Sequence, residues 1–224
     1  MTGAASGIGA ATMTLLVGRG WRVVGADLQQ QDSILRCDVT STESVQAAVE
    51  RCADENGSLD AVVNAAGVGY PVRFLDATDE TWHTLLDVNL MGTVRVCRAA
   101  VPHLRRSNHP SRGIVNFTSQ AAKTGGLLIG APYSAAKAAV LCLTKTLAGE
   151  FAGDGIRVNA VAPGIIDTPF LDFVPGIRER ATQLPLGRAG DPAEVAAVVS
   201  FLLSADASYL TGEIVDVNGG LYMD

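Results

Sequence analysis

Residues 2–27 of this chain read TGAASGIGAATMTLLVGRGWRVVGAD. The glycines at the start let the backbone approach a pyrophosphate closely, and the free N–H groups where the helical pattern of residues 10–17 begins favour its negative charge. Residues 22–26 indicate the next strand, and Asp27 ends it 18 residues past Gly9. A dinucleotide-binding fold places at about this distance the acid that accepts hydrogen bonds from the ribose hydroxyls. Each feature alone has an ordinary structural explanation, but the two together favour a bound nucleotide.

The rest of the chain continues this alternation of short apolar runs and longer helical patterns. Near-continuous apolar runs are typical of parallel strands that are covered on both faces. The runs that we expect to be strands are residues 22–26, 34–37, 60–64, 113–118, 156–161 and 213–217. This order predicts an α/β fold with a Rossmann-like, doubly wound parallel sheet. No linker, low-complexity segment or repeat interrupts it, so we expect residues 1–224 to form a single domain.

Helix-start signals lie between these runs. Residues 40–43 read as a capping box ahead of apolar residues at helical spacing, and Thr78 precedes a long helical segment that reaches Leu104. Residues 191–194 combine a capping aspartate, a first-turn proline and a capping glutamate before an apolar helix.

Composition and charge exclude several classes of function. The chain is 48% hydrophobic and 18% charged, which is typical of a folded globular protein. Its formal net charge is −6 and its basic residues are scattered, so we expect no nucleic-acid partner. No apolar run reaches the roughly 18 residues that a membrane span needs, and the N-terminus does not resemble a signal peptide. We therefore expect a cytoplasmic protein with no membrane partner.

The cysteines point to no metal. Cys37, Cys52, Cys97 and Cys142 form no CxxC pair and have no histidine nearby in a ligand pattern. We interpret them as buried, reduced thiols.

A tyrosine and a lysine share one face of a predicted helix. Tyr133 and Lys137 stand four residues apart at the start of an alanine-rich stretch, so their side chains point the same way. A neighbouring cation stabilises a phenolate and lowers the pKa of the tyrosine from its usual value of about 10. Tyr133 would then exchange a proton with an alcohol near neutral pH. Chance produces this spacing often enough that the pair alone proves little.

Ser119 directly follows the apolar run at residues 113–118. Ligands of open α/β sheets bind outside the carboxyl ends of the strands, so this hydroxyl faces the expected crevice and can donate to a substrate oxygen. A serine after a strand is also a common turn residue. Both interpretations stay open on this pattern alone.

Together these motifs resemble those of the classical short-chain dehydrogenases/reductases, and the resemblance covers essentially the whole chain. That family carries a Thr-Gly-x-x-x-Gly-x-Gly turn, an acidic pair on the adenine side, an Asn-x-Ala-Gly strand end, a helix-borne asparagine, a serine, Tyr-x-x-x-Lys and Pro-Gly. The matching positions here are residues 2–9, 38–39, 64–67, Asn89, Ser119, Tyr133 with Lys137, and residues 163–164. So many ordered motifs make the resemblance highly specific.

The resemblance implies a catalytic tetrad of Asn89, Ser119, Tyr133 and Lys137. Tyr133 is expected to act as acid or base toward a substrate oxygen that Ser119 holds and orients. Lys137 is expected to lower the pKa of the tyrosine and to bind the nicotinamide ribose. Asn89 is expected to fix a water that links Lys137 to solvent, and a polar residue that merely bends a long helix is the alternative at that position.

The resemblance also implies a nicotinamide cofactor. Thr168 looks like the residue that contacts the nicotinamide amide, with a helix cap as the alternative. NAD is expected rather than NADP, because Asp27 would repel the extra phosphate and position 6 is a serine where relatives that use NADP commonly carry a basic residue nearby. The expected cofactor-binding residues are Gly3, Ser6, Gly7, Ile8, Gly9, Asp27, Asp38, Val39, Asn64, Ala65, Ala66, Gly67, Tyr133, Lys137, Pro163, Gly164, Ile166 and Thr168.

We therefore expect an NAD-dependent oxidoreductase that transfers a hydride between nicotinamide and a secondary alcohol or ketone. A small apolar substrate is favoured, although core packing explains the same side chains equally well. The apolar residues in question are Leu127, Leu128, Ile129, Phe170, Leu171, Phe173 and Val174. The resemblance suggests a homo-oligomer, a tetramer or a dimer, and a partner helix would approach closely over Ala135, Ala136, Ala138 and Ala139. A nucleotide-binding module without turnover stays open as an alternative.

The N-terminus is the weakest part of this interpretation. In this fold a strand precedes the glycine turn and lies at the centre of the sheet, yet only Met1 stands before Thr2. We therefore expect a sheet that lacks its first, central strand, and for the native protein a start upstream of Met1. For the 224-residue chain we expect a perturbed cofactor turn and weak or absent NAD binding, because a phosphate-binding loop works only when both of its ends are held. A remnant without a cofactor is thus a second alternative.

Overall fold

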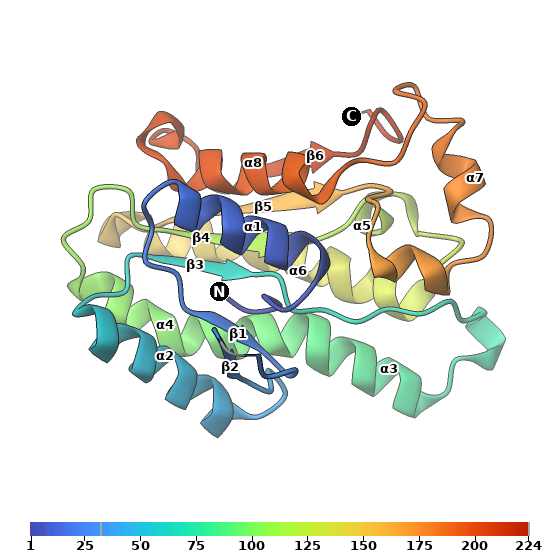
Figure 1. Ribbon diagram of the computed structural model, residues 1–224. Coiled ribbons are helices and arrows are strands. Elements are labelled where there is room, and N and C mark those ends of the chain that lie inside the picture. Colours follow the sequence, from blue (N-terminus) through green and yellow to red (C-terminus); the bar gives the residue numbers. More distant parts are fainter. Residues whose placement is uncertain (32, 224) are drawn as a thin grey trace.

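A parallel β-sheet runs through the centre of the computed structural model, which describes residues 1–31 and 33–223 (Figure 1). β1 pairs with β2, and β3, β4, β5 and β6 form a four-stranded ladder in that order, all of it parallel. The strands are β1 (Gly25–Asp27), β2 (Ile34–Arg36), β3 (Ala61–Asn64), β4 (Gly113–Phe117), β5 (Arg157–Pro163) and β6 (Ile214–Val217). The predicted Rossmann-like parallel sheet is confirmed.

Met1 and Thr2 join the two groups of strands. Thr2 forms parallel bridges to Ala26 of β1 and to Asn64 of β3. Its N–H donates to Val63 O at 3.0 Å, and Met1 O accepts from Ala26 N at 2.8 Å. Among the described residues, no strand longer than this one rung precedes the glycine turn. The rung formed by Met1 and Thr2 therefore occupies the centre of the sheet. The turn is thereby held on its N-terminal side, which does not bear out the perturbation that we expected there.

Beyond this rung, a cavity of about 390 Å³ separates the segment before β1 from β3. Its wall combines apolar residues such as Leu16 and Val63 with charged ones such as Arg22 and Asp60.

Helices cover both faces of the sheet. Figure 1 shows α1 and α8 side by side on one face, with α2 and α4 on the other. The longer helices are α1 (Gly7–Gly18), α2 (Thr42–Asn56), α3 (Asp79–Leu86), α4 (Gly92–Arg106), α6 (Ala131–Phe151) and α8 (Pro192–Leu203). The shorter helical segments are η1 (Phe74–Asp76), η2 (Asp87–Met91), α5 (Ala121–Thr124), η3 (Ala152–Asp154), η4 (Pro169–Phe173), α7 (Ile177–Ala181) and η5 (Ala205–Ala207).

The core lies in two layers because alternate strand residues face opposite sides of the sheet. Val63 and Val115 pack against Val199 of α8 in one layer. Val62 and Ile114 pack in the other layer, beneath α2, α4 and α6. Both faces of these strands are apolar, which explains their near-continuous hydrophobic sequence.

The predicted cap of α8 is confirmed, whereas that of α2 is shifted. Asp191 Oδ1 accepts from Ala193 N and Glu194 Oε2 accepts from Asp191 N, both at 2.7 Å. α2 starts one residue later than predicted, and Ser41 Oγ accepts from Ser44 N at 3.1 Å in the capping position. Thr40 is drawn away because its hydroxyl donates to Asp38 at 2.7 Å.

The prediction that all four cysteines are buried is only partly right. Cys37 and Cys97 are buried, Cys52 is half-buried and Cys142 on α6 is exposed. Burial raises the pKa of the Cys97 thiol to about 12. Across residues 1–31 and 33–223, no helix is long and apolar enough to cross a membrane, and no cluster of metal-binding side chains occurs.

Candidate active site

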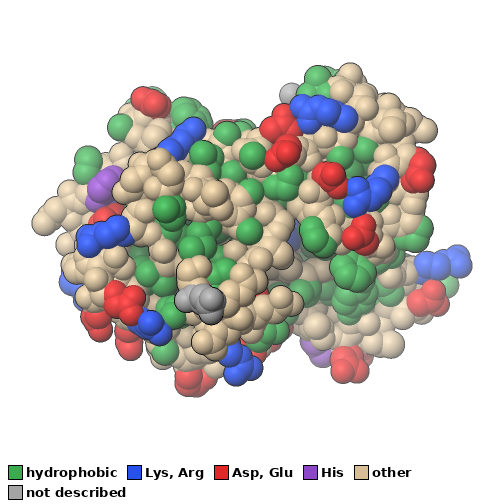
Figure 2. Space-filling view, viewed as in Figure 1, with side chains coloured by type: hydrophobic (Ala, Val, Ile, Leu, Met, Phe, Trp, Pro, Cys, Tyr) green, Lys and Arg blue, Asp and Glu red, His purple; other side chains and the backbone are tan. Residues whose placement is uncertain are grey.

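A cleft of about 730 Å³ opens at the carboxyl ends of the strands. Figure 2 shows the surface hollowed between α1 and the segment that carries η4. All four residues of the expected catalytic tetrad line this cleft, and so does every expected cofactor-binding residue except Asn64. The position agrees with the general rule for open α/β sheets, where ligands bind beyond the strand ends.

The glycine turn forms one end of the cleft, and its tight packing requires glycine. Gly3 has a φ of 70°, and a Cβ there would lie 2.6 Å from the backbone of Ala65. A Cβ on Gly9 would lie 1.7 Å from Gly3 O. Ser6, the N-cap of α1, makes no side-chain hydrogen bond to the first turn of the helix. The N–H groups at this helix start, left without a side-chain cap, suit the diphosphate of a dinucleotide.

Two anchored carboxylates stand near the glycine turn. Asp27 Oδ2 accepts from Ala5 N at 3.0 Å, and Asp27 Oδ1 accepts from Gln29 N at 3.1 Å. Asp38 accepts from the hydroxyl and the N–H of Thr40, and these bonds lower the pKa of the Asp38 carboxyl. Both groups line the cleft, so this end favours a ligand that donates hydrogen bonds and disfavours an additional phosphate.

At the other end, Lys137 lies beneath the ring of Tyr133. Lys137 is 4% exposed, and its Nζ donates to Phe117 O at 3.0 Å. This ammonium stands 5.8 Å from the centroid of the Tyr133 ring. Burial lowers the pKa of Lys137 to about 8. An ammonium has three donors, so Lys137 keeps donors for a ligand in the cleft.

Burial raises the pKa of Tyr133, and the neighbouring Ser119 side chain offsets part of that rise. The net direction is opposite to the lowered pKa that we expected from Lys137. In the free protein, the free-energy cost of removing the phenolate from water exceeds the stabilisation that neighbouring groups give it.

Ser119 connects the end of β4 to α5. Its Oγ accepts from Ala121 N at 3.1 Å, and Ser119 and Tyr133 line the same cleft. The turn interpretation and the catalytic interpretation are therefore compatible, since Ser119 both takes part in this turn and lines the cleft with Tyr133.

Asn89 lies in η2, a π-helical turn that separates α3 from α4. Its Nδ2 donates to Val68 O at 2.8 Å and to Leu85 O at 2.9 Å. A Cβ added to Gly67 would lie 2.8 Å from Asn89 Oδ1 and 3.2 Å from Lys137 Nζ. The widened helix thus brings the asparagine amide and the lysine to either side of Gly67.

Thr168 and Asn64 differ in where the structure places them. Thr168 occupies the N-cap position of η4 but makes no side-chain hydrogen bond to it. It lines the cleft and faces the glycine turn, because a Cβ on Gly7 would lie 3.3 Å from its Cγ2. Asn64, also expected to bind the cofactor, does not line the cleft. Its side chain is 3% exposed and donates to Asn116 Oδ1 at 2.9 Å inside the sheet.

Among the residues that line the cleft, the sequence motifs assign no role to Gln120, Arg180 and Leu221. Gln120 follows Ser119 directly, and that adjacency was a usable signal. Arg180 on α7 and Leu221 near the C-terminus belong to no motif, and only the folded chain brings them to the cleft.

Comparisons with known proteins extend over the whole chain. A family model described as enoyl-(acyl carrier protein) reductase matches residues 3–222. The 3-oxoacyl-(acyl-carrier-protein) reductase of Thermotoga maritima is 37% identical over 99% of this chain and 96% of its own length. L-fucose dehydrogenase of Oryctolagus cuniculus is 40% identical over 98% of this chain and 83% of its own length.

A solved structure shows the same similarity in three dimensions. The structure of a 3-oxoacyl-(acyl-carrier protein) reductase with bound NAD from Brucella melitensis matches with a TM-score of 0.87 and 36% identity, over 100% of this chain and 90% of that one. These comparisons give no support to the alternative of a remnant that has lost its cofactor.

Proposed function

Because this chain belongs to the short-chain dehydrogenase/reductase family, we propose that it is an NAD-dependent oxidoreductase that interconverts a secondary alcohol and a ketone. The observation that carries the proposal is a single cleft with a nucleotide-binding end and a proton-transfer end. Gly3, Gly7 and Asp27 line the first end, and Ser119, Tyr133 and Lys137 line the second.

NAD, when bound, supplies the hydride acceptor for alcohol oxidation. Tyr133 takes the proton of the substrate hydroxyl in that direction and returns it in the other. Ser119, which lines the same end of the cleft as Tyr133, orients the substrate oxygen toward the phenol. The Lys137 ammonium favours the phenolate electrostatically, and its remaining donors suit ribose hydroxyls.

NAD is favoured over NADP by the charge at the nucleotide end. The Asp27 carboxylate is fixed by backbone N–H groups at 3.0 and 3.1 Å, and an additional phosphate on the adenosine ribose would bring like charges together. Ser6 offers no cation to offset this repulsion.

The substrate end of the cleft favours an apolar alcohol or ketone. Leu128, Ile129, Phe170 and Val174 line it, and the ring of Phe170 stands 6.0 Å from that of Tyr133. Ile129 and Val174 are also buried, so they serve the core as well as the cleft wall.

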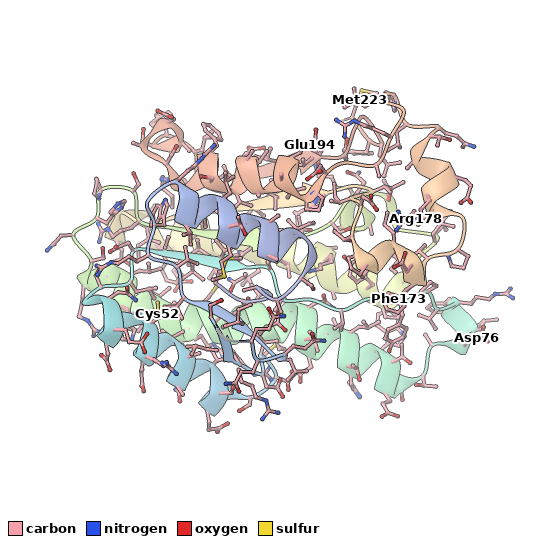
Figure 3. All side chains as sticks on the ribbon, in the orientation of Figure 1. Cys52, Asp76, Phe173, Arg178, Glu194 and Met223 are labelled. Carbon is pink, nitrogen blue, oxygen red and sulfur yellow. The ribbon has the colours of Figure 1, made fainter. Side chains whose placement is uncertain are left out.

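One of the apolar residues expected in the cleft lies elsewhere. Phe173 is 63% exposed and does not line the cleft. It lies on η4 and faces the segment that carries Asp76 (Figure 3).

We place the enzyme in the cytoplasm as a single-domain chain, residues 1–224, that forms a tetramer or a dimer. Ala135 on α6 is exposed and Ala138 is half-buried, and small residues at these positions leave room for a helix of a second copy. Its net charge of −6 is unfavourable for binding a polyanion, so we propose no nucleic-acid partner.

A fluorescence titration with NADH and NADPH, followed by a panel of secondary alcohols with NAD, tests the proposal. We expect NADH to bind more tightly than NADPH, and apolar secondary alcohols to be oxidised. Binding of NADH without turnover of any alcohol or ketone would instead favour the nucleotide-binding module. Absence of binding would contradict both functions.

A further inference from the structure

Arg180 brings an exposed cation to the wall of the cleft. It lies on α7 and lines the cleft. Among the described residues of the cleft wall, the other charged side chains are those of Asp27, Asp38 and Lys137. The two carboxylates stand at the nucleotide end, and Lys137 is only 4% exposed. Arg180 is therefore the one exposed cation that the described cleft wall offers to a ligand.

The geometry of α7 places Arg180 beside the apolar part of this wall. Ile177 stands three residues earlier, so its side chain and that of Arg180 point to the same face of the helix. Ile177 lines the cleft too and packs against the cluster that contains Ile129 and Val174. Tyr133 packs against the same cluster. Arg180 thus stands one helical turn from an apolar surface that adjoins the proton-transfer residue.

The guanidinium of Arg180 is not engaged by the protein. Its side chain makes no hydrogen bond or ion pair with any residue that the structure describes. Arg178 on the same helix differs, because it donates to Asp167 at 2.6 Å and to Asp172 at 2.9 Å and does not line the cleft. The cation that points away from the cleft is therefore paired within the protein, whereas the cation at the cleft keeps its donors for a ligand.

We propose that Arg180 selects substrates in which an apolar body separates the reacting carbon from a carboxylate. The proposal rests on the proposed function and names the substrate class of that site. A guanidinium presents its donors in a planar fork that matches the two oxygens of a carboxylate. Tyr133 meets the alcohol or ketone oxygen, the apolar wall covers the middle of the substrate, and Arg180 binds its far end. An amine at that end would instead meet a like charge.

The test uses secondary alcohols that differ only in charge. The hydroxyl group stands next to the terminal methyl group of hydroxyhexanoate, hydroxyoctanoate and hydroxydecanoate, and each acid is compared with its own methyl ester. Arg180→Met keeps an extended side chain and removes the charge, whereas Arg180→Lys keeps the charge without the planar fork. Arg178→Met is the matched control, because it removes the same charge from the same helix at a position outside the cleft.

Two quantities are measured in the wild type and in each variant. The first is kcat/KM with NAD for each acid and its ester, together with the NADH dissociation constant. The second is the affinity for octanoate, measured by calorimetry with and without NADH. Octanoate has the carboxylate and the apolar chain but no hydroxyl group, so its binding does not depend on turnover.

In the wild type, kcat/KM is expected to be at least about tenfold higher for the best acid than for its ester. Arg180→Met is expected to remove this preference, mainly through a higher KM for the acid, and to weaken octanoate binding about tenfold. The ester and NADH are expected to stay within about twofold of their wild-type values. Arg180→Lys is expected to recover part of the preference, and Arg178→Met to leave it unchanged.

The proposal is overturned if no acid is preferred to its ester, or if Arg180→Met changes the preference no more than Arg178→Met does. A loss of NADH affinity in Arg180→Met that lowers kcat/KM equally for acid and ester would also overturn it, because the cation would then serve the cofactor. If the wild type oxidises no acid, ester or apolar alcohol, the proposed function fails. Octanoate then decides separately: equal affinity in the wild type and Arg180→Met contradicts a carboxylate site at Arg180, and a tenfold loss supports it.

Discussion

At the scale of single residues, Tyr133 and Lys137 are both shifted toward their neutral forms by burial. The pKa of the phenol is raised and that of the ammonium is lowered to about 8. Both shifts have the same cause, because burial removes each charged form from water. The free protein therefore keeps Tyr133 as a phenol at neutral pH, which is the form that ketone reduction requires.

This protonation state gives the two directions of the reaction opposite pH dependences. Oxidation needs the phenolate as base, so its kcat/KM is expected to rise with pH as Tyr133 loses its proton, and reduction is expected to fall over the same range. Lys137→Met removes a cation that stands 5.8 Å from the ring, which raises the pKa of Tyr133 further and moves the rise in oxidation to higher pH. The exposed Lys145, two turns further along α6, supplies the control variant Lys145→Met. Coincident pH profiles of the wild type and Lys137→Met would contradict the role of Lys137.

The preference for NAD over NADP is also expected to depend on a single residue, Asp27. Asp27→Asn keeps an acceptor for Ala5 N and removes the charge, so the turn stays anchored while the repulsion of a phosphate disappears. The ratio of NADPH to NADH dissociation constants is expected to fall about tenfold, measured by fluorescence titration. An unchanged ratio in Asp27→Asn would show that the carboxylate does not select the cofactor.

The identities of the site residues could be read from the sequence, but their environments could not. The motif containing Asn64 identified a strand end, yet the amide of Asn64 turns into the sheet and bonds to Asn116. The lowering effect of Lys137 on Tyr133 was argued from spacing alone, and spacing carries no information about desolvation. The place of Leu221 in the cleft needed the tertiary arrangement, because the C-terminal segment meets the other cleft segments only in the folded chain.

At the scale of elements, the glycine turn and α1 form one unit whose geometry is set by close backbone contacts. A Cβ on Gly9 would lie 1.7 Å from Gly3 O, whereas a Cβ on Gly18 at the other end of α1 would meet nothing within 4 Å. The two positions provide a matched pair of substitutions on the same helix.

Gly9→Ala is expected to weaken NADH binding at least about tenfold and to lower the melting temperature, because the turn must open to admit the methyl group. Gly18→Ala is expected to leave NADH affinity unchanged and to stabilise α1 by up to about 1 kcal/mol, since alanine favours helix. Fluorescence titration and thermal unfolding of both variants check this. Equal NADH affinity in the two variants would contradict the assignment of the turn.

The start of a helix agrees with the sequence-based prediction where a local capping motif determines it. The Asp191 capping box predicts the start of α8 because aspartate, proline and glutamate all act within one turn. The segment from Thr78 to Leu104 reads as one helix, but η2 widens it at Asn89. That widening depends on the bonds from Asn89 to Val68 and Leu85, of which the contact with Val68 arises from tertiary folding.

At the scale of the whole molecule, the cleft is assembled from the ends of several strands and from segments far apart in the sequence. Gly3, Ala65, Ser119, Gly164 and Leu221 all line it. A ligand that contacts these segments together stabilises the folded state by mass action. NADH is therefore expected to raise the melting temperature in a concentration-dependent way, whereas a fixed melting temperature at saturating NADH would argue against cofactor binding in this cleft.

The centre of the sheet is where the sequence was least informative. We expected a gap before the glycine turn, and the described residues place one rung there, made by Met1 and Thr2, beside a cavity of about 390 Å³. Pairing of so short a segment on both sides is a tertiary effect, because Thr2 bonds to Val63, which lies in a strand some sixty residues away. Local pattern carries no signal for such a contact.

The most direct test of the account measures binding and chemistry in one variant. Tyr133→Phe keeps the ring beside Phe170 and removes only the hydroxyl. NADH affinity and the NADH-dependent rise in melting temperature are expected to stay as in the wild type, while turnover in both directions falls by more than tenfold, or about 1.4 kcal/mol of transition-state stabilisation. Turnover above about a tenth of the wild-type rate, with NADH bound, would contradict the central claim that Tyr133 transfers the proton.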